Sequence, residues 1–294
     1  MRAITFSRFG GPEVLEVSDL PVPEPGPDQV RIAVRAAGVN PYDWKVRSGA
    51  FGGELPQGTG GEVAGVVDKL GDGVGDVNVG DHVFGFARPG AAEYALSNAY
   101  APLPETLDFT GAAGLPVAVE TATRVLQEVP GKTIVINGAA GAVGQAAIQL
   151  ARAKGIRVIG TASEANQEFL RELGAEPTTY GHGLAARLAE FGPIDGAIDA
   201  GGHGALDDLI KATGDDPTRV VTIVDFAGAQ ASGAHFSGGA SPDKAAAAIR
   251  EIGPLIDAGK FKLGVAQTFP LEQVAAAHAL SETGHVRGKL ILLV

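Results

Sequence analysis

The fold of this chain is decided between residues 133 and 161, which read TIVINGAAGAVGQAAIQLARAKGIRVIGT. The apolar, β-branched run over 133–137 predicts a strand. A glycine-rich turn follows, and the alanine-rich stretch after it predicts a helix that runs to about Lys154 and ends at Gly155. A second apolar run predicts a strand that ends at Thr161. Strand, helix and strand within about 30 residues predict a parallel βαβ unit.

The glycines of this turn have the spacing of a dinucleotide-binding site. Gly141 lets backbone approach a pyrophosphate, and Gly144 lets the helix pack tightly on the strand. The helix N-terminus offers free N–H groups and the positive end of its dipole to the phosphates. The first glycine of the usual fingerprint is Ala139 here, and a purely structural turn is the alternative. The strand–turn–helix–strand setting favours dinucleotide binding.

The residue after the second strand bears on the choice of dinucleotide. An NAD-type site places Asp or Glu there to hold the ribose 2′-hydroxyl, and this chain has Ser163. A carboxylate would repel a 2′-phosphate, whereas a serine hydroxyl can donate to one. This favours NADPH and leaves NADH open, because residues 164–167 carry no Lys or Arg. The alternative role for Ser163 is to cap the helix predicted over 164–173.

The spacing of apolar residues divides the whole chain into three regions. Residues 113–264 alternate short β-branched runs with alanine-rich stretches, which predicts a doubly wound parallel sheet. Residues 1–112 carry short alternating runs between Pro and Gly clusters, which predicts mainly β structure. Residues 265–294 hold one predicted helix over 271–280 and an apolar run over 290–294 that suits a buried strand.

The composition narrows the classes of function. The chain has 294 residues, and its net charge of −11 repels nucleic acids and anionic membrane surfaces. No stretch approaches the roughly 18 apolar residues that cross a bilayer, and the start lacks a signal-peptide pattern. We therefore expect a cytoplasmic protein whose partners include neither nucleic acid nor membrane. The absence of cysteine excludes disulfides, thiolate-bound zinc and thiol nucleophiles.

Five segments carry a resemblance: FGGPEVL at 9–15, AGVNPYDWK at 37–45, GDHVF at 80–84, the glycine turn, and GHVRGK at 284–289. In this order they are similar to the zinc-independent quinone oxidoreductases of the medium-chain dehydrogenase/reductase superfamily, the relatives of zeta-crystallin. The resemblance implies an α/β fold and a homodimer. It implies a GroES-like domain over 1–112, completed by 265–294, and a Rossmann domain over 113–264.

The resemblance also bears on metal binding. Zinc-dependent relatives use a Cys, a His-Glu pair and a second Cys or Asp, and these places are held here by Asn40, by Gly61-Glu62 and by Val117. Because one carboxylate is left, the resemblance implies an enzyme without zinc. The six histidines form no helical i, i+4 pair, and we expect them in solvated or structural roles. They are His82, His182, His203, His235, His278 and His285.

The family's cofactor contacts fall on residues spread along the Rossmann region. The resemblance places the pyrophosphate at the glycine turn, the adenosine 2′ side after the second strand, a further dinucleotide contact after the strand predicted over 194–199, and the nicotinamide after the strand predicted over 219–224. Asp225-Phe226-Ala227 replaces the usual glycine-containing turn there. The contacts are Ala140, Gly141, Ala142, Val143 and Gly144 in the turn, Ser163 and Tyr180 on the adenosine side, His203 along the dinucleotide, and Val224 and Phe236 at the nicotinamide.

Without a metal, hydrogen-bond donors have to stabilise charge on the oxygen of a hydride acceptor. Asn40, Tyr42 and Lys45 follow a predicted strand, each can donate, and the family places active-site polar residues at or beside the equivalents of Asn40 and Lys45. The alternatives are structural: Asn40 satisfies a loop backbone, Tyr42 is a core ring and Lys45 is a solvated charge. We expect Asp43 to fix local geometry by pairing with Arg47.

These features favour an NADPH-dependent, metal-free oxidoreductase that transfers hydride to a quinone or another α,β-unsaturated carbonyl. A second enzymatic reading is a reductase of enoyl or alkenal double bonds. A reading of another class is an NADPH-binding sensor or scaffold without turnover, which the irregular segment over 225–227 and the uncommon Glu120 before Thr121 favour. Neither a Gly-x-Ser-x-Gly elbow nor a phosphate-binding loop with its lysine is present, which argues against a hydrolase.

Overall fold

The computed structural model describes residues 1–294, and the chain forms two units. The β-rich unit contains Met1–Val117 and Ser241–Val294. The dinucleotide-fold unit contains Ala118–Ala240. Each unit has its own sheets and its own hydrophobic core.

Helix α9 (Pro242–Asp257) is where this division differs most from the boundaries at 112 and 264 that the sequence predicts. It packs against strand β8 (Ala99–Pro102), and its residues Ile249 and Ile252 are buried. Residues 241–264 therefore belong to the β-rich unit. A strand followed by an amphipathic helix has the same hydrophobic period in either unit, so periodicity alone does not assign this helix.

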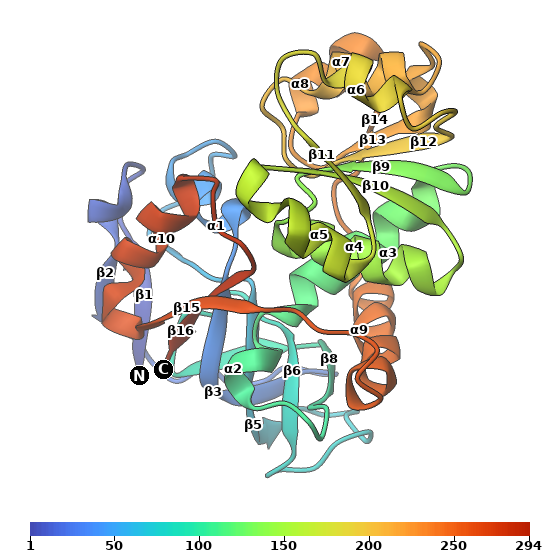
Figure 1. The fold of residues 1–294 in the computed structure, drawn as a ribbon. Helices are drawn as coiled ribbons and strands as arrows, with labels where there is room; N and C mark the ends of the chain where they lie inside the picture. Colours follow the sequence, from blue (N-terminus) through green and yellow to red (C-terminus); the bar gives the residue numbers. More distant parts are fainter. The chain divides into compact units, whose positions relative to one another are not determined.

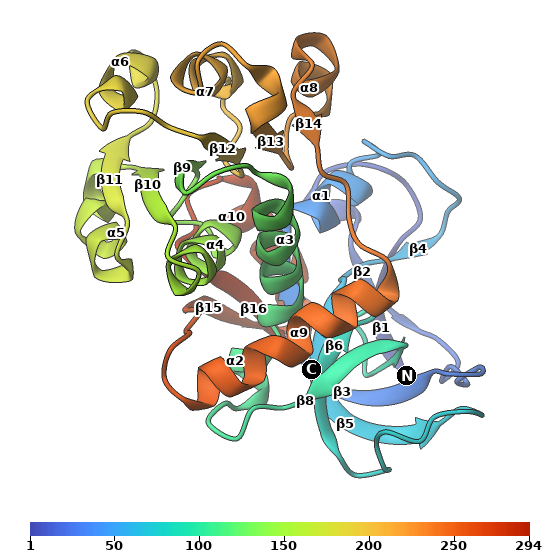
Figure 2. The same cartoon turned by 90° about the vertical axis from the view of Figure 1, so that its right-hand side faces the viewer.

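The dinucleotide-fold unit is doubly wound, as predicted. Its six strands are all parallel, in the order β11-β10-β9-β12-β13-β14. Helices α4 and α5 lie on one face of the sheet and α6, α7 and α8 on the other, which Figures 1 and 2 show from two sides. The strands are β9 (Thr133–Asn137), β10 (Arg157–Ala162), β11 (Glu176–Thr179), β12 (Gly196–Asp199), β13 (Val220–Thr222) and β14 (His235–Phe236). The helices are α3 (Leu115–Glu128), which begins in the other unit, α4 (Ala142–Ala153), α5 (Gln167–Leu173), α6 (Leu184–Ala189), α7 (Leu206–Ala212), α8 (Phe226–Ser232), and the 3₁₀ turns η2 (Glu164–Asn166) and η3 (Pro217–Arg219).

The strand order of this unit reverses at β9. From β9 the chain adds β10 and β11 on one side, and it then crosses to add β12, β13 and β14 on the other. In open α/β sheets, ligands bind beyond the carboxyl ends of the strands at such a reversal. The glycine-rich turn follows β9 directly and therefore lies at this position.

The β-rich unit contains two sheets. The larger has the strand order β15-β16-β3-β5-β6-β8, with β7 also paired to β3, and the smaller has the order β2-β1-β4. Strand β16, near the end of the chain, pairs antiparallel with β3 and so completes the larger sheet. The strands are β1 (Arg2–Phe6), β2 (Glu16–Asp19), β3 (Val30–Val39), β4 (Gln57–Gly58), β5 (Glu62–Leu70), β6 (His82–Phe86), β7 (Tyr94–Ser97), β15 (Val265–Pro270) and β16 (Lys289–Leu293). The helices are α1 (Pro41–Arg47), α2 (Phe109–Ala112), α10 (Val274–Glu282), and the 3₁₀ turns η1 (Pro12–Val14) and η4 (Leu271–Gln273).

Helix α1 is held against helix α10 by the buried side chain of Arg47. Its guanidinium forms an ion pair with Glu282 of α10, and its Nη1 lies 3.4 Å from Nδ1 of His278. Burial, together with this guanidinium, lowers the pKa of His278 to about 4. The predicted Asp43–Arg47 pair is therefore wrong. Asp43 fixes the local geometry by accepting a hydrogen bond from the Asn40 N–H.

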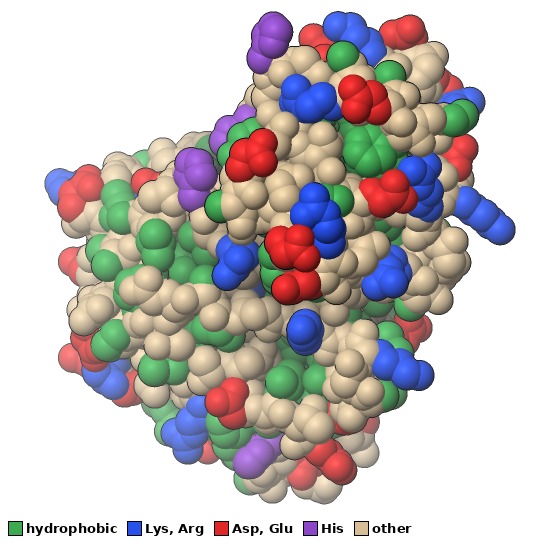
Figure 3. Space-filling view, viewed as in Figure 1, with side chains coloured by type: hydrophobic (Ala, Val, Ile, Leu, Met, Phe, Trp, Pro, Cys, Tyr) green, Lys and Arg blue, Asp and Glu red, His purple; other side chains and the backbone are tan.

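Two observations concern the exterior of the chain. No helix has both the length and the apolar character that crossing a membrane requires. On the face drawn in Figure 3, acidic and basic side chains are interspersed rather than gathered by sign. This face therefore offers no concentrated positive surface to a polyanion.

Candidate functional site

The glycine-rich turn leads from β9 into α4. Gly141 precedes the helix with an extended backbone, and α4 begins at Ala142. A Cβ atom at Gly144 would lie 2.6 Å from the Ala139 Cα and from the Gly138 carbonyl oxygen, so only glycine lets the helix pack this closely. A Cβ at Gly141 would meet only the Gly138 oxygen, at 3.4 Å. Gly141 is therefore not required by packing, and its missing side chain keeps the space at the helix N-terminus open.

A buried chain of hydrogen bonds lies beneath this turn and joins four strands. Thr161 Oγ1 donates to Asn137 Oδ1 at 2.7 Å, and Asn137 Nδ2 donates to Asp199 Oδ1 at 2.9 Å. Thr222 Oγ1 donates to Asp199 Oδ2 at 3.0 Å. All four side chains are buried. Sequence reasoning missed this network, although a polar residue at or near the end of four otherwise apolar strands was a signal for it.

The same network shapes the loops that follow the strands. The Asp199 Oδ1 atom accepts from the backbone N–H groups of Gly201 and Gly202, at 3.2 and 2.8 Å. The Gly138 N–H donates to Thr161 Oγ1 at 3.2 Å. A Cβ at Gly138 would lie 2.8 Å from the Gly201 Cα, so the two glycine loops pass very close to each other. The buried Asp199 carboxylate is thus compensated by donors that include the Gly201–Gly202 loop, and Thr161 fixes the Gly138 loop.

All of the predicted cofactor residues lie at one edge of this sheet. The turn follows β9, Ser163 follows β10, and Tyr180 follows β11. His203 lies in the loop after β12 with a left-handed backbone, φ +59°. Val224 follows β13, and Phe236 is the last residue of β14. The structure thus brings together Ala140, Gly141, Ala142, Val143, Gly144, Ser163, Tyr180, His203, Val224 and Phe236 at the carboxyl ends of parallel strands.

The backbone of Ser163 lies at the N-terminal end of η2, but its side chain forms no capping hydrogen bond. Ser163 therefore occupies the predicted N-cap position, and its backbone oxygen, not its hydroxyl, accepts the hydrogen bond from the helix. The Ser163 Oγ atom instead accepts a hydrogen bond from Asn166 Nδ2 at 3.1 Å. This bond leaves the hydroxyl proton of Ser163 available to an acceptor beyond the strand end.

The loop that carries Tyr180 is organised by Arg187, which sequence reasoning missed. The Arg187 guanidinium donates to the carbonyl oxygens of Thr179, Tyr180 and Gly181, at 3.0 to 3.3 Å. Nearly half of the Tyr180 side chain is exposed. Arg187 therefore fixes the backbone of this loop while the Tyr180 ring is free to meet a ligand.

Segment Asp225-Phe226-Ala227 forms the start of helix α8. The Asp225 carboxylate caps it by accepting from the Gly228 N–H at 2.8 Å. The exposed Phe226 ring meets the Phe236 ring edge to face, with centroids 5.2 Å apart. Segment 225–227 therefore begins a helix and places a second aromatic ring beside Phe236.

In the β-rich unit, Asn40, Glu62 and Lys289 form a closed polar cluster. Lys289 Nζ donates to Asn40 Oδ1 at 2.6 Å and to Glu62 Oε1 at 2.5 Å. Asn40 Nδ2 donates to the same Glu62 oxygen at 2.8 Å. The alternative in which Asn40 only satisfies a loop backbone is wrong, because its amide binds two charged side chains. Lys289 belongs to a segment used for the family resemblance, but sequence reasoning gave it no role.

This cluster is removed from solvent and built into the sheet. The exposed fractions of Glu62, Lys289 and Asn40 are 0%, 3% and 6%. The second carboxylate oxygen, Glu62 Oε2, accepts from the Val117 N–H at 2.7 Å. A Cβ at Gly38 would lie 2.2 Å from Glu62 Oε1, so glycine makes room for the carboxylate. The charges of Glu62 and Lys289 compensate each other, as a buried pair requires.

Tyr42 and Lys45 lie on the same helix, α1, but outside the cluster. The Tyr42 ring is 44% exposed and stacks on Phe51, with centroids 5.1 Å apart. The Arg88 guanidinium lies 4.6 Å from its centroid. The core-ring alternative for Tyr42 is therefore wrong. Lys45 Nζ lies 5.7 Å from the centroid of the Trp44 ring.

Asp43 is buried beside this cluster. Its carboxylate accepts from the Asn40 N–H at 2.8 Å. Burial raises the pKa of Asp43 to about 6, against the opposing effect of this hydrogen bond. Asp43 therefore changes charge near pH 6 while it is hydrogen-bonded to the Asn40 N–H.

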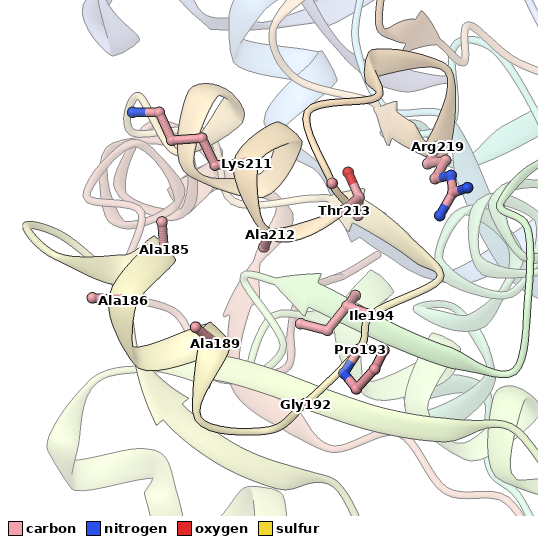
Figure 4. A pocket seen from close by; sticks show the side chains of 11 residues that line it. Ala185, Ala186, Ala189, Gly192, Pro193, Ile194, Lys211, Ala212, Thr213 and Arg219 are labelled. Carbon is pink, nitrogen blue, oxygen red and sulfur yellow. The ribbon is translucent and has the colours of Figure 1, made fainter.

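A surface groove of about 630 Å³ lies elsewhere, between helices α6 and α7. Figure 4 shows Ala189, Ile194 and Thr213 among the side chains that line it. Ile194 precedes β12 and Arg219 precedes β13, so the groove lies at the amino ends of these strands. It is therefore at the opposite edge of the sheet from the predicted cofactor residues.

Comparisons with known proteins fit this geometry. Residues 26–130 match the family model of the alcohol dehydrogenase GroES-like domain, and residues 173–292 match that of zinc-binding dehydrogenases. A quinone oxidoreductase of Rattus norvegicus is 45% identical over 187 residues, which cover 60% of this chain and 57% of the rat protein. The match thus spans little more than half the length of that relative.

Two other matches extend over the whole chain. The chloroplastic NADPH-dependent alkenal/one oxidoreductase of Arabidopsis thaliana is 34% identical over 99% of this chain and 79% of its own length. The solved quinone oxidoreductase of Coxiella burnetii has a TM-score of 0.85 and 34% identity, and the match covers 100% of this chain and 99% of that one.

The name of the second family model raises the question of zinc, and the polar cluster does not fit this ion. Structural and catalytic zinc sites are built from Cys, His and carboxylate ligands in tetrahedral arrangement. Here Lys289 places its ammonium against both Asn40 Oδ1 and Glu62 Oε1, and the remaining oxygen, Glu62 Oε2, accepts from the Val117 N–H. No group of three or more His, Cys, Asp or Glu residues in the chain could hold a metal ion.

Proposed function

Since the chain belongs to the quinone oxidoreductases of the medium-chain dehydrogenase/reductase superfamily, we propose that it transfers a hydride from NADPH to a quinone or another α,β-unsaturated carbonyl without zinc. The observation that carries this proposal is the glycine turn, which enters α4 at the strand reversal of a doubly wound sheet. The names of the Arabidopsis and Coxiella relatives support the cofactor and the substrate class.

The dinucleotide-fold unit supplies the residues that would hold the cofactor. The N-terminus of α4, opened by Gly141, would bind the pyrophosphate through backbone N–H groups, which suits a chain of net charge −11. The Ser163 hydroxyl and Tyr180 would bind the adenosine 2′ side. His203 would contact the dinucleotide, and Val224 and Phe236 would line the nicotinamide. When bound, NADPH supplies the hydride from C4 of its nicotinamide.

The β-rich unit supplies the donor for the acceptor's oxygen. The Asn40 side-chain oxygen accepts a hydrogen bond from Lys289, and one of its N–H groups donates to Glu62. A primary amide has two N–H donors, so one is left for the substrate. As negative charge develops on the carbonyl oxygen, this N–H stabilises it from a fixed position. Tyr42 and Lys45 are the further donors that we propose near the substrate.

The test uses purified protein treated with a metal chelator. When the protein is mixed with NADPH, the fluorescence of NADPH should be quenched or shifted. If that fluorescence does not change at millimolar NADPH, the proposal is wrong. Steady-state NADPH oxidation with 1,4-benzoquinone, 9,10-phenanthrenequinone and an alkenal then assigns the acceptor. Turnover of the quinones supports the main proposal, and turnover of the alkenal alone supports a double-bond reductase, which the Arabidopsis relative's name favours.

A sensor or scaffold without turnover remains the candidate of another class. It predicts tight NADPH binding with no oxidation by any of the three acceptors. One of the two observations that favoured it, the segment over 225–227, has a local explanation as the capped start of α8. We further propose a cytoplasmic homodimer, and size-exclusion chromatography with light scattering tests the dimer.

A further inference from the structure

We propose that Lys289 is a positioning residue: it fixes the orientation of the Asn40 amide and strengthens the one N–H that Asn40 presents to the hydride acceptor. The inference rests on the proposed function, and it adds a role for a residue 249 positions away in the chain. It concerns only the β-rich unit, where Asn40, Glu62 and Lys289 all lie.

The register of three neighbouring strands brings these residues together. Leu290 pairs with Val39, so Lys289, the first residue of β16, faces Asn40 just beyond the end of β3. Ala37 pairs with Val63, so Glu62, the first residue of β5, faces Gly38. The order β16-β3-β5 therefore delivers an ammonium, an amide and a carboxylate to one end of the sheet.

The charges around Asn40 allow only one orientation of its amide. The oxygen faces the Lys289 ammonium at 2.6 Å, and the nitrogen faces the Glu62 carboxylate at 2.8 Å. A flipped amide would direct N–H groups at the ammonium and its oxygen at the carboxylate, and both contacts would be repulsive. The second N–H therefore keeps one direction. A neutral pair at these positions would remove this constraint.

The ammonium also changes the strength of the donor. Hydrogen bonds in chains polarise one another, and the effect is larger where water is excluded. Because Lys289 withdraws electron density through the amide oxygen, the N–H on the other side of Asn40 becomes a better donor to a developing oxyanion. Lys289 thus acts on the donor through the Asn40 oxygen, its charge is compensated by Glu62, and it does not touch the substrate.

The placement is costly, which argues that more than packing maintains it. Buried ion pairs are seldom favourable compared with apolar residues of similar shape. The chain nevertheless makes room for this pair with glycines: a Cβ at Gly114 would lie 2.8 Å from the Lys289 Cγ, and a Cβ at Gly38 would lie 2.2 Å from the Glu62 carboxylate. Glu62 is fixed in addition by the Val117 N–H.

The experiment compares Lys289→Met/Glu62→Gln, which removes both charges together, with the wild type, in turnover of NADPH and 1,4-benzoquinone. We expect kcat to fall about 100-fold, the scale of losing one oxyanion donor, while the Kd of NADPH is unchanged. The control Lys69→Met/Glu24→Gln removes an exposed ion pair of the same unit and should leave kcat unchanged. Lys289→Gln, which keeps a donor for Glu62, is the second variant if the pair does not fold, and its kcat should fall about tenfold.

A double-mutant cycle separates positioning from mere structure. In an Asn40→Ala background, the Lys289 substitutions should lower kcat no further, because they act through Asn40. Additive losses, or a folded Lys289 variant with kcat within twofold of the wild type, would overturn the inference.

A measurement without turnover keeps the inference distinguishable from the proposed function. With ¹⁵N-labelled asparagine, the Asn40 side chain should give two widely separated N–H proton resonances that exchange slowly with water in the wild type, and these should converge in Lys289→Met/Glu62→Gln. If wild-type protein oxidises no NADPH, the proposed function fails while this spectrum still tests the amide's orientation. Identical Asn40 resonances in the two proteins would contradict it.

Discussion

Asp43 shows how a buried carboxyl sets a pH dependence at the scale of one residue. Its pKa is raised from 3.8 to about 6, mainly by burial, so the folded state binds its proton more tightly than the unfolded state does. The free energy of unfolding contributed by this group is therefore greatest below pH 4, falls as the pH rises from about 4 to about 6, and stays lower above that.

Replacing Asp43 with Asn should therefore stabilise the protein above pH 6 and change little near pH 4. Asn can still accept from the Asn40 N–H, and the gain has an upper bound of roughly 3 kcal/mol for a shift of about two pKa units. Urea unfolding of both proteins at pH 4 and pH 8 measures the difference. The two proteins are compared at each pH because His278 changes the stability of both. Its pKa is lowered to about 4, so the stability that it contributes is lost as the pH falls from about 6.5. Equal stability of the two proteins at pH 8 would contradict the assignment.

Ser163 is the residue that we expect to favour NADPH over NADH. Substituting Glu for Ser163 should raise the Kd of NADPH at least tenfold, about 1.4 kcal/mol, because the new carboxylate repels the 2′-phosphate. The Kd of NADH should stay the same or fall, since a carboxylate can bind a ribose 2′-hydroxyl. Ser163→Asn is the neutral control. Fluorescence titrations with both cofactors measure the effect, and parallel changes in the two Kd values would place the 2′-phosphate elsewhere.

At the scale of elements, the two glycines of the β9–α4 junction have different roles: Gly144 is required for packing, and Gly141 is expected to serve NADPH binding. An alanine Cβ at Gly144 would lie 2.6 Å from the backbone of the turn, whereas at Gly141 it would be in ordinary contact at 3.4 Å. Gly144→Ala should therefore lower the Tm by several degrees, as overpacking costs about 1–3 kcal/mol. Gly141→Ala should keep its Tm and weaken NADPH binding. Thermal melts with and without NADPH measure both effects, and equal Tm losses in the two variants would contradict this division of roles.

The sequence was most informative where chemistry is local. Strand β9 and the end of α4 near Lys154 were predicted correctly because their signals lie within 30 residues of each other, whereas α4 begins at Ala142, inside the segment predicted as the turn. Arg47 was assigned wrongly because helical spacing offered it Asp43, whereas its partner, Glu282, lies 235 residues away. Local spacing does not reveal a competing partner that only the folded β-rich unit brings close.

At the scale of the whole molecule, the same limit explains what was missed in the site. The predicted cofactor residues lie at one edge because parallel strands share their carboxyl ends, a rule that can be applied to sequence. The contact of Lys289 with Asn40 depends on the pairing of β16 with β3, which no local pattern specifies. The boundary near residue 241 was missed for a similar reason, since α9 is assigned by what it packs against.

The central claim is hydride transfer from NADPH without a metal, and one measurement tests it most directly. Chelator-treated protein is assayed for oxidation of NADPH and of NADPH deuterated at the transferred C4 position, with 9,10-phenanthrenequinone as acceptor. We predict undiminished turnover after chelation, no gain on adding Zn²⁺, and a slower rate with the deuterated cofactor. Activity that disappears on chelation and returns with Zn²⁺ would contradict the account, and so would a complete absence of NADPH oxidation.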